Sequence, residues 1–109
     1  MSGILAVLNT SILTADGIYR LRTVSLDEAL VLVDLATGLD SAVGHAATAA
    51  ILTELLGTEV PVHRQLFVQK PGQLALVFKM KGRPEEGQIL SRDEIEAMGY
   101  ELKVLERIS

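Results

Sequence analysis

Apolar and polar residues follow two different periods along this chain. Short apolar runs and period-two alternation are typical of strands, and they occur in five segments: 4–8, 18–24, 62–69, 74–80 and 100–108. Apolar residues at helical spacing, preceded by capping residues, occur in three segments: 25–36, 40–57 and 91–98. This order predicts an α/β fold: a single domain over residues 1–109, with a mixed β-sheet of about five strands and flanking helices.

The predicted helix between residues 40 and 57 has the clearest start and stop. Asp40 and Ser41 are good N-cap residues, Gly57 is a typical C-terminal stop, and no proline interrupts the run. One apolar stripe along this helix consists of Ile51, Leu52, Leu55 and Leu56. The stripe extends back to Gly44 and His45, so we expect His45 to face inward beside the positive helix end. Free backbone N–H groups at such an end bind anions, and Gly44 would let a phosphate come close.

Polar residues follow the first predicted strand. Asn9, Thr10 and Ser11 are candidates for ligand contacts at the strand tip. In the alternative interpretation, Asn9 and Ser11 only hydrogen-bond the backbone of a turn. The turn residues Asp16 and Gly17 then predict that the first two strands pair as a hairpin.

Composition narrows the classes of function. The chain of 109 residues has no cysteine and two histidines, which excludes a disulfide framework and gives no basis for a zinc centre or another cofactor. The formal charge of −4 argues against binding long DNA or RNA, although it permits a small anionic ligand in a local basic pocket. No apolar run reaches the length of about eighteen residues that a membrane span needs, and the first residues lack the basic flank of a signal peptide. We therefore expect a cytoplasmic protein with no membrane partner.

The remaining candidate chemistry centres on one histidine. The sequence contains no glycine-rich phosphate loop and no recognisable nucleophile elbow. His45 remains, together with Arg83 and Glu86 on a charged loop. This set suits phosphodiester cleavage without a metal, because an imidazolium can protonate a leaving oxygen, an arginine can hold the phosphate, and a carboxylate can orient the imidazole. Alternatively, His45 is a half-buried structural histidine, and Arg83 with Glu86 is an exposed ion pair. His63, near Pro61, is interpreted as structural or as a surface residue.

Several segments recur together in one known family. They are Leu-Asn-Thr-Ser-Ile at the start, Ala-Val-Gly-His-Ala-Ala-Thr followed by Leu-Leu-Gly-Thr, then Arg64, and Gly-Arg-Pro-Glu-Glu-Gly-Gln-Ile-Leu. The pattern resembles the ring nucleases of type III CRISPR systems, a family shared with viral anti-CRISPR ring nucleases, and it covers nearly the whole chain. Those enzymes degrade cyclic tetra-adenylate, the second messenger that activates CRISPR ancillary nucleases in antiviral defence. The chain departs from many viral members in carrying Ala46 and Ala47 after the Gly-His pair.

The resemblance implies a metal-independent phosphodiesterase that acts as a homodimer, with cyclic tetra-adenylate held across the subunit interface. Matching positions make His45 the general acid, Glu86 its helper and Arg83 the phosphate-holding residue. The family's ligand-binding positions fall on Asn9, Ser11, Gly44 and Arg64. A ribose 2′-OH would attack its adjacent phosphate while His45 protonates the leaving 5′-oxygen, which opens the ring.

Two other functions are compatible with the same sequence. One is a non-catalytic protein that binds and sequesters the cyclic nucleotide. The other is a structural dimerisation module without a ligand.

Overall fold

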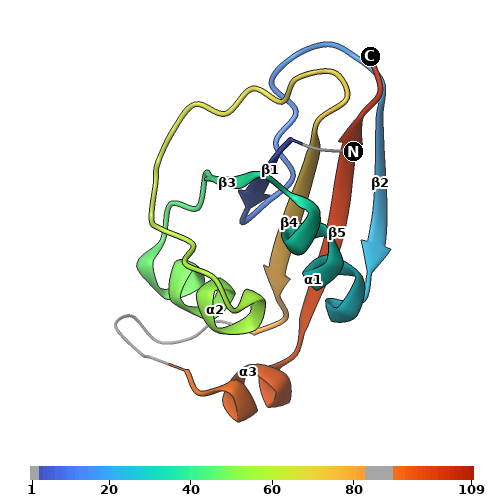
Figure 1. Ribbon diagram of the computed structural model, residues 1–109. Helices are drawn as coiled ribbons and strands as arrows, with labels where there is room; N and C mark the ends of the chain where they lie inside the picture. Colours follow the sequence, from blue (N-terminus) through green and yellow to red (C-terminus); the bar gives the residue numbers. More distant parts are fainter. Residues whose placement is uncertain (1–2, 83–89) are drawn as a thin grey trace.

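The computed structural model describes residues 3–82 and 90–109, which contain five strands and three helices (Figure 1). The strands are Ile4–Leu8 (β1), Tyr19–Val24 (β2), Gly38–Ser41 (β3), Leu74–Met80 (β4) and Tyr100–Arg107 (β5). The helices are Leu26–Leu35 (α1), Ala46–Leu56 (α2) and Arg92–Met98 (α3). The predicted α/β fold with a five-stranded mixed sheet is confirmed.

The sheet has the strand order β2-β5-β4-β1-β3. β1 is parallel to both of its neighbours, with Ala6 opposite Asp40 in β3 and opposite Ala75 in β4. β5 is antiparallel to β4 and to β2. The predicted hairpin of the first two strands is therefore wrong: both sides of β1 are occupied, and β2 pairs with β5 at the far edge of the sheet.

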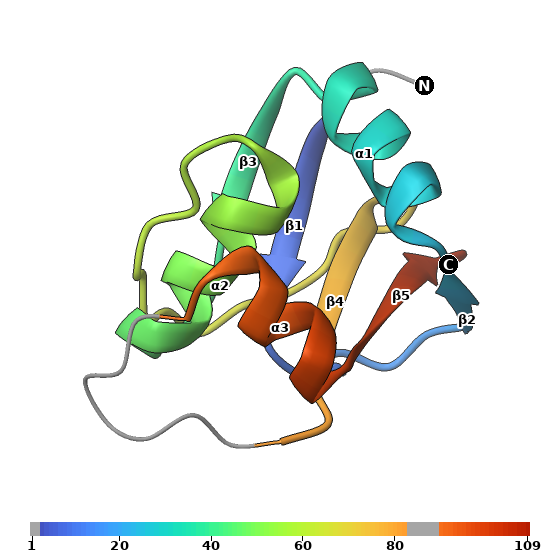
Figure 2. The ribbon, with the colours of Figure 1, turned by 90° about the horizontal axis from the view of Figure 1, so that it is seen from below.

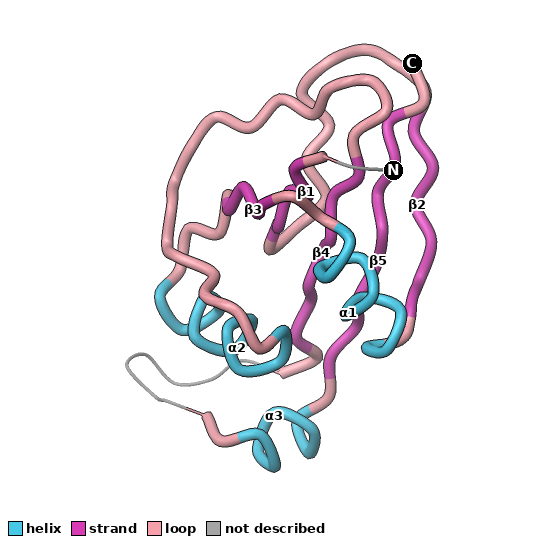
Figure 3. Tube along the Cα trace, in the orientation of Figure 1, coloured by secondary structure: helices cyan, strands magenta, loops and turns pink. Residues whose placement is uncertain are grey.

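The predicted strand over residues 62–69 is also wrong. The fifth strand of the sheet is Gly38–Ser41, which includes the predicted N-cap residues Asp40 and Ser41. Figure 3 shows the chain between α2 and β4 as one continuous loop. Phe67 and Gln69 in this loop are buried, whereas Leu66 and Val68 are exposed, so the segment does have the predicted alternation. The alternation arises because the loop is extended and packs one of its two sides against the protein. Within the described residues, this loop does not pair with any strand of the sheet.

Capping residues set most of the helix ends. The side chain of Ser25 accepts a hydrogen bond from the backbone N–H of Glu28 at the start of α1. Ser91 and Glu94 form a complete capping box at α3, in agreement with the helix that the capping residues predict over residues 91–98. Gly57 ends α2 in the left-handed conformation, with φ of 68°. The predicted start of α2 was wrong by several residues, because the helix begins at Ala46 after β3.

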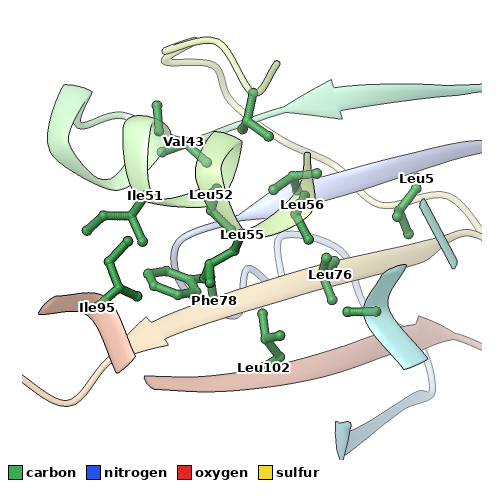
Figure 4. Close-up of a cluster of buried hydrophobic side chains, with 14 of the residues drawn as sticks. Leu5, Val43, Ile51, Leu52, Leu55, Leu56, Leu76, Phe78, Ile95 and Leu102 are labelled. Atoms are coloured by element: carbon green, nitrogen blue, oxygen red, sulfur yellow. The ribbon is translucent and has the colours of Figure 1, made fainter. Parts of the chain in front are cut away.

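Apolar side chains lie on both faces of the sheet. The three helices cover one face (Figure 2), and the predicted leucine stripe of α2 packs there against β4, with Leu52 and Leu55 near Phe78 (Figure 4). The other face carries a smaller cluster made of Ala6, Leu8, Ala42, Phe67, Ala75, Val77 and Leu105. Loop segments rather than helices cover this second face, since Phe67 comes from the loop after α2, and Ile12 packs on the cluster from the loop after β1.

Candidate functional site

Three parallel strands end at the same edge of the sheet. Because β1, β3 and β4 are parallel, their carboxyl ends at Leu8, Ser41 and Met80 point to the same edge. Ligands of open α/β sheets commonly bind outside the carboxyl ends of the strands. The segments that follow these ends are residues 9–11, residues 42–45 and the loop that starts at Lys81, and they contain most of the predicted site residues.

His45 is the N-cap residue of α2, and its side chain is exposed. The expectation that His45 faces inward was wrong. The helix begins at the next residue, Ala46, so His45 precedes the helix and its ring is not part of the apolar stripe. The carbonyl of His45 accepts a hydrogen bond from the N–H of Ala49 at 3.0 Å, but its side chain makes no capping bond. The ring therefore makes no bond to the helix end, and the backbone N–H groups of the first turn are not capped by it.

Arg64 lies against Gly44, the residue that precedes His45. The guanidinium Nε donates a hydrogen bond to the carbonyl of Gly44 at 3.0 Å, and the Arg64 side chain is exposed. A Cβ atom at position 44 would lie 3.3 Å from Cγ of Arg64, closer than an ordinary contact. Glycine at position 44 therefore lets the arginine side chain cross the start of the helix. The structure thus brings Arg64 against Gly44, the residue before His45, and all three are among the predicted site residues.

The segment around Arg64 is attached to the end of β3 by residues that sequence analysis missed. Gln65 Nε2 donates to Asp40 Oδ1 at 2.9 Å and to the carbonyl of Ser41 at 2.7 Å. His63 Nδ1 lies 3.1 Å from the same carbonyl. The sequence does contain a sign of these contacts, since His63 and Gln65 are polar residues on the side of the alternating run that also carries the buried Phe67.

Other predicted residues are near this edge or outside the described part. Asn9 is half-buried and Thr10 and Ser11 are exposed directly after β1. Among the described residues, none of these three side chains makes a hydrogen bond, so the alternative that Asn9 and Ser11 only stabilise a turn gains no support. Arg83 and Glu86 lie outside the described residues.

The candidate site is an open surface rather than a deep cavity. A cavity of about 900 Å³ lies between the end of α1 and the loop before β4, where Leu35, Leu39 and Leu66 line it. None of the predicted site residues in the described part lines this cavity. A ligand at His45 and Arg64 would therefore need a further surface to enclose it.

Neither a metal-ligating cluster nor a membrane-spanning helix is found within residues 3–82 and 90–109. No group of three or more histidine, aspartate and glutamate side chains is arranged to hold a metal ion there. In the same ranges, no helix has both the length and the apolar character that crossing a membrane requires.

Comparison with known proteins identifies the family. The model of the STIV B116-like family matches residues 5–102. The chain belongs to this family. One relative is the uncharacterized protein ORF117 of Acidianus two-tailed virus, 35% identical over 92 residues that cover 83% of this chain and 79% of ORF117. Another is the uncharacterized protein YddF of Bacillus subtilis, 30% identical over 105 residues that cover 95% and 97% of the two chains.

The solved structure of B116 from Sulfolobus turreted icosahedral virus shares the fold of this family member. The two structures superpose with a TM-score of 0.77 at 20% sequence identity, over 95% of this chain and 98% of B116.

Proposed function

We propose that this protein is a metal-independent ring nuclease that binds cyclic tetra-adenylate at a homodimer interface and cleaves it in the cytoplasm. The observation that carries the proposal is the exposed His45 at the uncapped start of α2, with Arg64 beside it. The sequence pattern around these residues resembles that of ring nucleases. By removing the messenger, the protein would switch off type III CRISPR signalling.

In this mechanism the nucleophile comes from the substrate. The 2′-oxygen of one ribose attacks the adjacent phosphorus and releases its proton to solvent, while the bond from phosphorus to the 5′-oxygen breaks. His45, in its protonated form, donates a proton to that leaving oxygen, and the product ends in a 2′,3′-cyclic phosphate. No metal is needed to generate the nucleophile, because the 2′-OH is already next to the phosphorus. Glu86 would assist His45, and Arg83 would hold the phosphate.

The described residues offer two kinds of ligand contact. The uncapped N–H groups of α2 suit a phosphate oxygen, since a helix start carries partial positive charge. The terminal nitrogens of Arg64 can contact the same or a neighbouring phosphate, because only Nε is used by Gly44. Asn9, Thr10 and Ser11 follow the adjacent strand and would contact the ribose or base.

A second copy of the chain would supply the missing half of the site. Four phosphates in a ring are compatible with two-fold symmetry, and both His45 and Arg64 are exposed in the single chain. Exposed apolar residues flank Arg64: Leu66 is 86% exposed and Val62 is 49% exposed. Such residues are suited to burial against a partner.

The proposal is tested by incubating the purified protein with cyclic oligoadenylates of several ring sizes and identifying the products by mass. Linear products with a 2′,3′-cyclic phosphate, formed in the presence of EDTA, are expected from the tetra-adenylate ring. Tight binding without any product would favour the sequestering protein. Absence of both binding and a thermal shift with every ring would favour a structural dimerisation module.

A further inference from the structure

The junction between β3 and α2 is held by the loop after α2, not by a capping side chain. Ser41 Oγ donates to the carbonyl of Pro61 at 2.6 Å, and the N–H of His63 donates to the carbonyl of Val43 at 2.9 Å. Elsewhere in the chain, Ser25 and Ser91 fix the starts of α1 and α3 with their own side chains. At α2 these contacts set the path of the chain into the helix while the N-cap ring of His45 makes no capping bond.

The side chain of Gln65 bonds two acceptors at this junction. Its side-chain NH2 group has two hydrogens, and Asp40 Oδ1 at 2.9 Å and the Ser41 carbonyl at 2.7 Å accept them. The bond to Asp40 involves a carboxylate, and such charge-assisted bonds are stronger than neutral ones. Because both acceptors are oxygens, only a donor group fits between them.

We propose that Gln65 is a positioning residue for Arg64, and this rests on the proposed function of the site. Arg64 lies between His63 and Gln65, and both neighbours contact the end of β3. With its backbone held on both sides, the long Arg64 side chain is directed across Gly44 to the start of α2. Gln65 itself points to Asp40, away from a ligand bound at His45, and acts through Arg64.

The test uses Gln65→Glu, which has nearly the same shape but places oxygens opposite both acceptors. With a 2′-deoxy tetra-adenylate ring that resists cleavage, we expect affinity to fall roughly tenfold or more, toward that of Arg64→Ala, because the arginine is no longer held. The double variant should bind no more weakly than Arg64→Ala alone, since the two residues act in series. Adding Asp40→Asn to Gln65→Glu should restore part of the affinity, because the new amide at position 40 can donate to the carboxylate introduced at position 65.

Gln73→Glu is the matched control. Gln73 lies in the same loop, and its Oε1 accepts from the N–H of Lys70 at 2.9 Å, so a carboxylate keeps that bond. This variant should bind the ring as the wild type does. Equal losses in Gln65→Glu and Gln73→Glu, or fully additive losses with Arg64→Ala, would overturn the positioning role.

A readout without ligand separates this inference from the proposed function. The Arg64 Nε–H signal in ¹⁵N NMR spectra should be sharp in the wild type, where Gly44 accepts its hydrogen bond, and exchange-broadened in Gln65→Glu. If the wild type binds no cyclic oligoadenylate but shows this change, the proposed function fails and the positioning of Arg64 by Gln65 stands. If the ring is bound and cleaved but the Arg64 signal is the same in both proteins, the proposed function stands and the positioning role is wrong.

Discussion

Replacing His45 should separate the stability of α2 from the chemistry at its start. An N-cap side chain that bonds the helix contributes about 1 kcal/mol to stability relative to alanine. The His45 ring is exposed and makes no such bond, so His45→Ala should change the free energy of unfolding by less than about 0.5 kcal/mol. The loss of a general acid should nevertheless reduce the single-turnover rate roughly a hundredfold or more, which corresponds to about 2.7 kcal/mol of barrier.

His45→Asn should also lose the general acid, but it should raise the stability of α2. Asparagine is a preferred N-cap residue, so it should stabilise α2 by about 1 kcal/mol and raise the Tm by about 4 °C. The same side chain would compete with a phosphate for the helix N–H groups. We therefore expect His45→Asn to bind the ring more weakly than His45→Ala, although both should show the same large loss of cleavage rate.

The assay combines urea unfolding with single-turnover cleavage of labelled cyclic tetra-adenylate. Ser91→Ala is the control for capping, because Ser91 and Glu94 bond each other reciprocally at α3, and it should cost about 1 kcal/mol without affecting the rate. A destabilisation of His45→Ala equal to that of Ser91→Ala would show that the ring has a structural role. A near-normal cleavage rate in His45→Ala would refute the assignment of the general acid.

Four further predictions follow from the site and the core. A 2′-deoxy ring should bind but resist cleavage and EDTA should not inhibit the wild type; normal cleavage of the 2′-deoxy ring would exclude the internal nucleophile. Light scattering should give twice the chain mass of 11.8 kDa, and a fully active monomer would contradict the shared site. Gly44→Ala should weaken ring binding severalfold at unchanged Tm, because the new Cβ would lie 3.3 Å from Cγ of Arg64. Unchanged affinity in titration calorimetry would show that the position of Arg64 does not matter for binding the ring. Phe78→Ala should cost about 3–5 kcal/mol in urea unfolding, because Phe78 is 1% exposed, whereas Val31→Ala, at 55% exposure, should stay within about 0.5 kcal/mol.

Local signals in the sequence predicted most elements but not their pairing. Capping at Ser25 and Ser91 and the stop at Gly57 depend on neighbouring residues, and these were predicted correctly. The pairing of β2 with β5 joins residues such as Tyr19 and Arg107, far apart in sequence, and no local pattern encodes it. β3 was missed because a four-residue edge strand containing glycine and aspartate has the composition of a turn.

The candidate site was predicted in part for the same reason. The position of His45 at the start of α2 follows from local helix signals, but its orientation depends on where the helix begins, and the sequence offered Asp40 and Ser41 as better caps. Those two residues belong instead to β3 and bond the loop around Gln65. The contacts of Asp40 and Ser41 within the folded protein therefore outweigh their preference for helix N-caps. Because α2 begins only after His45, the ring is exposed and does not face inward as expected.

The central position of β1 has a consequence for how the protein is made. β1 is synthesised before the other four strands, and all but one of its five residues are buried in the finished sheet. Its partner β4 starts about 70 residues later, which takes roughly 4–14 seconds at translation rates of about 5–20 residues per second. During this time an apolar strand with an unpaired edge is outside its final sheet, where it can associate with other chains. The nascent chain is therefore more prone to aggregation before β4 is made than after the sheet has closed around β1.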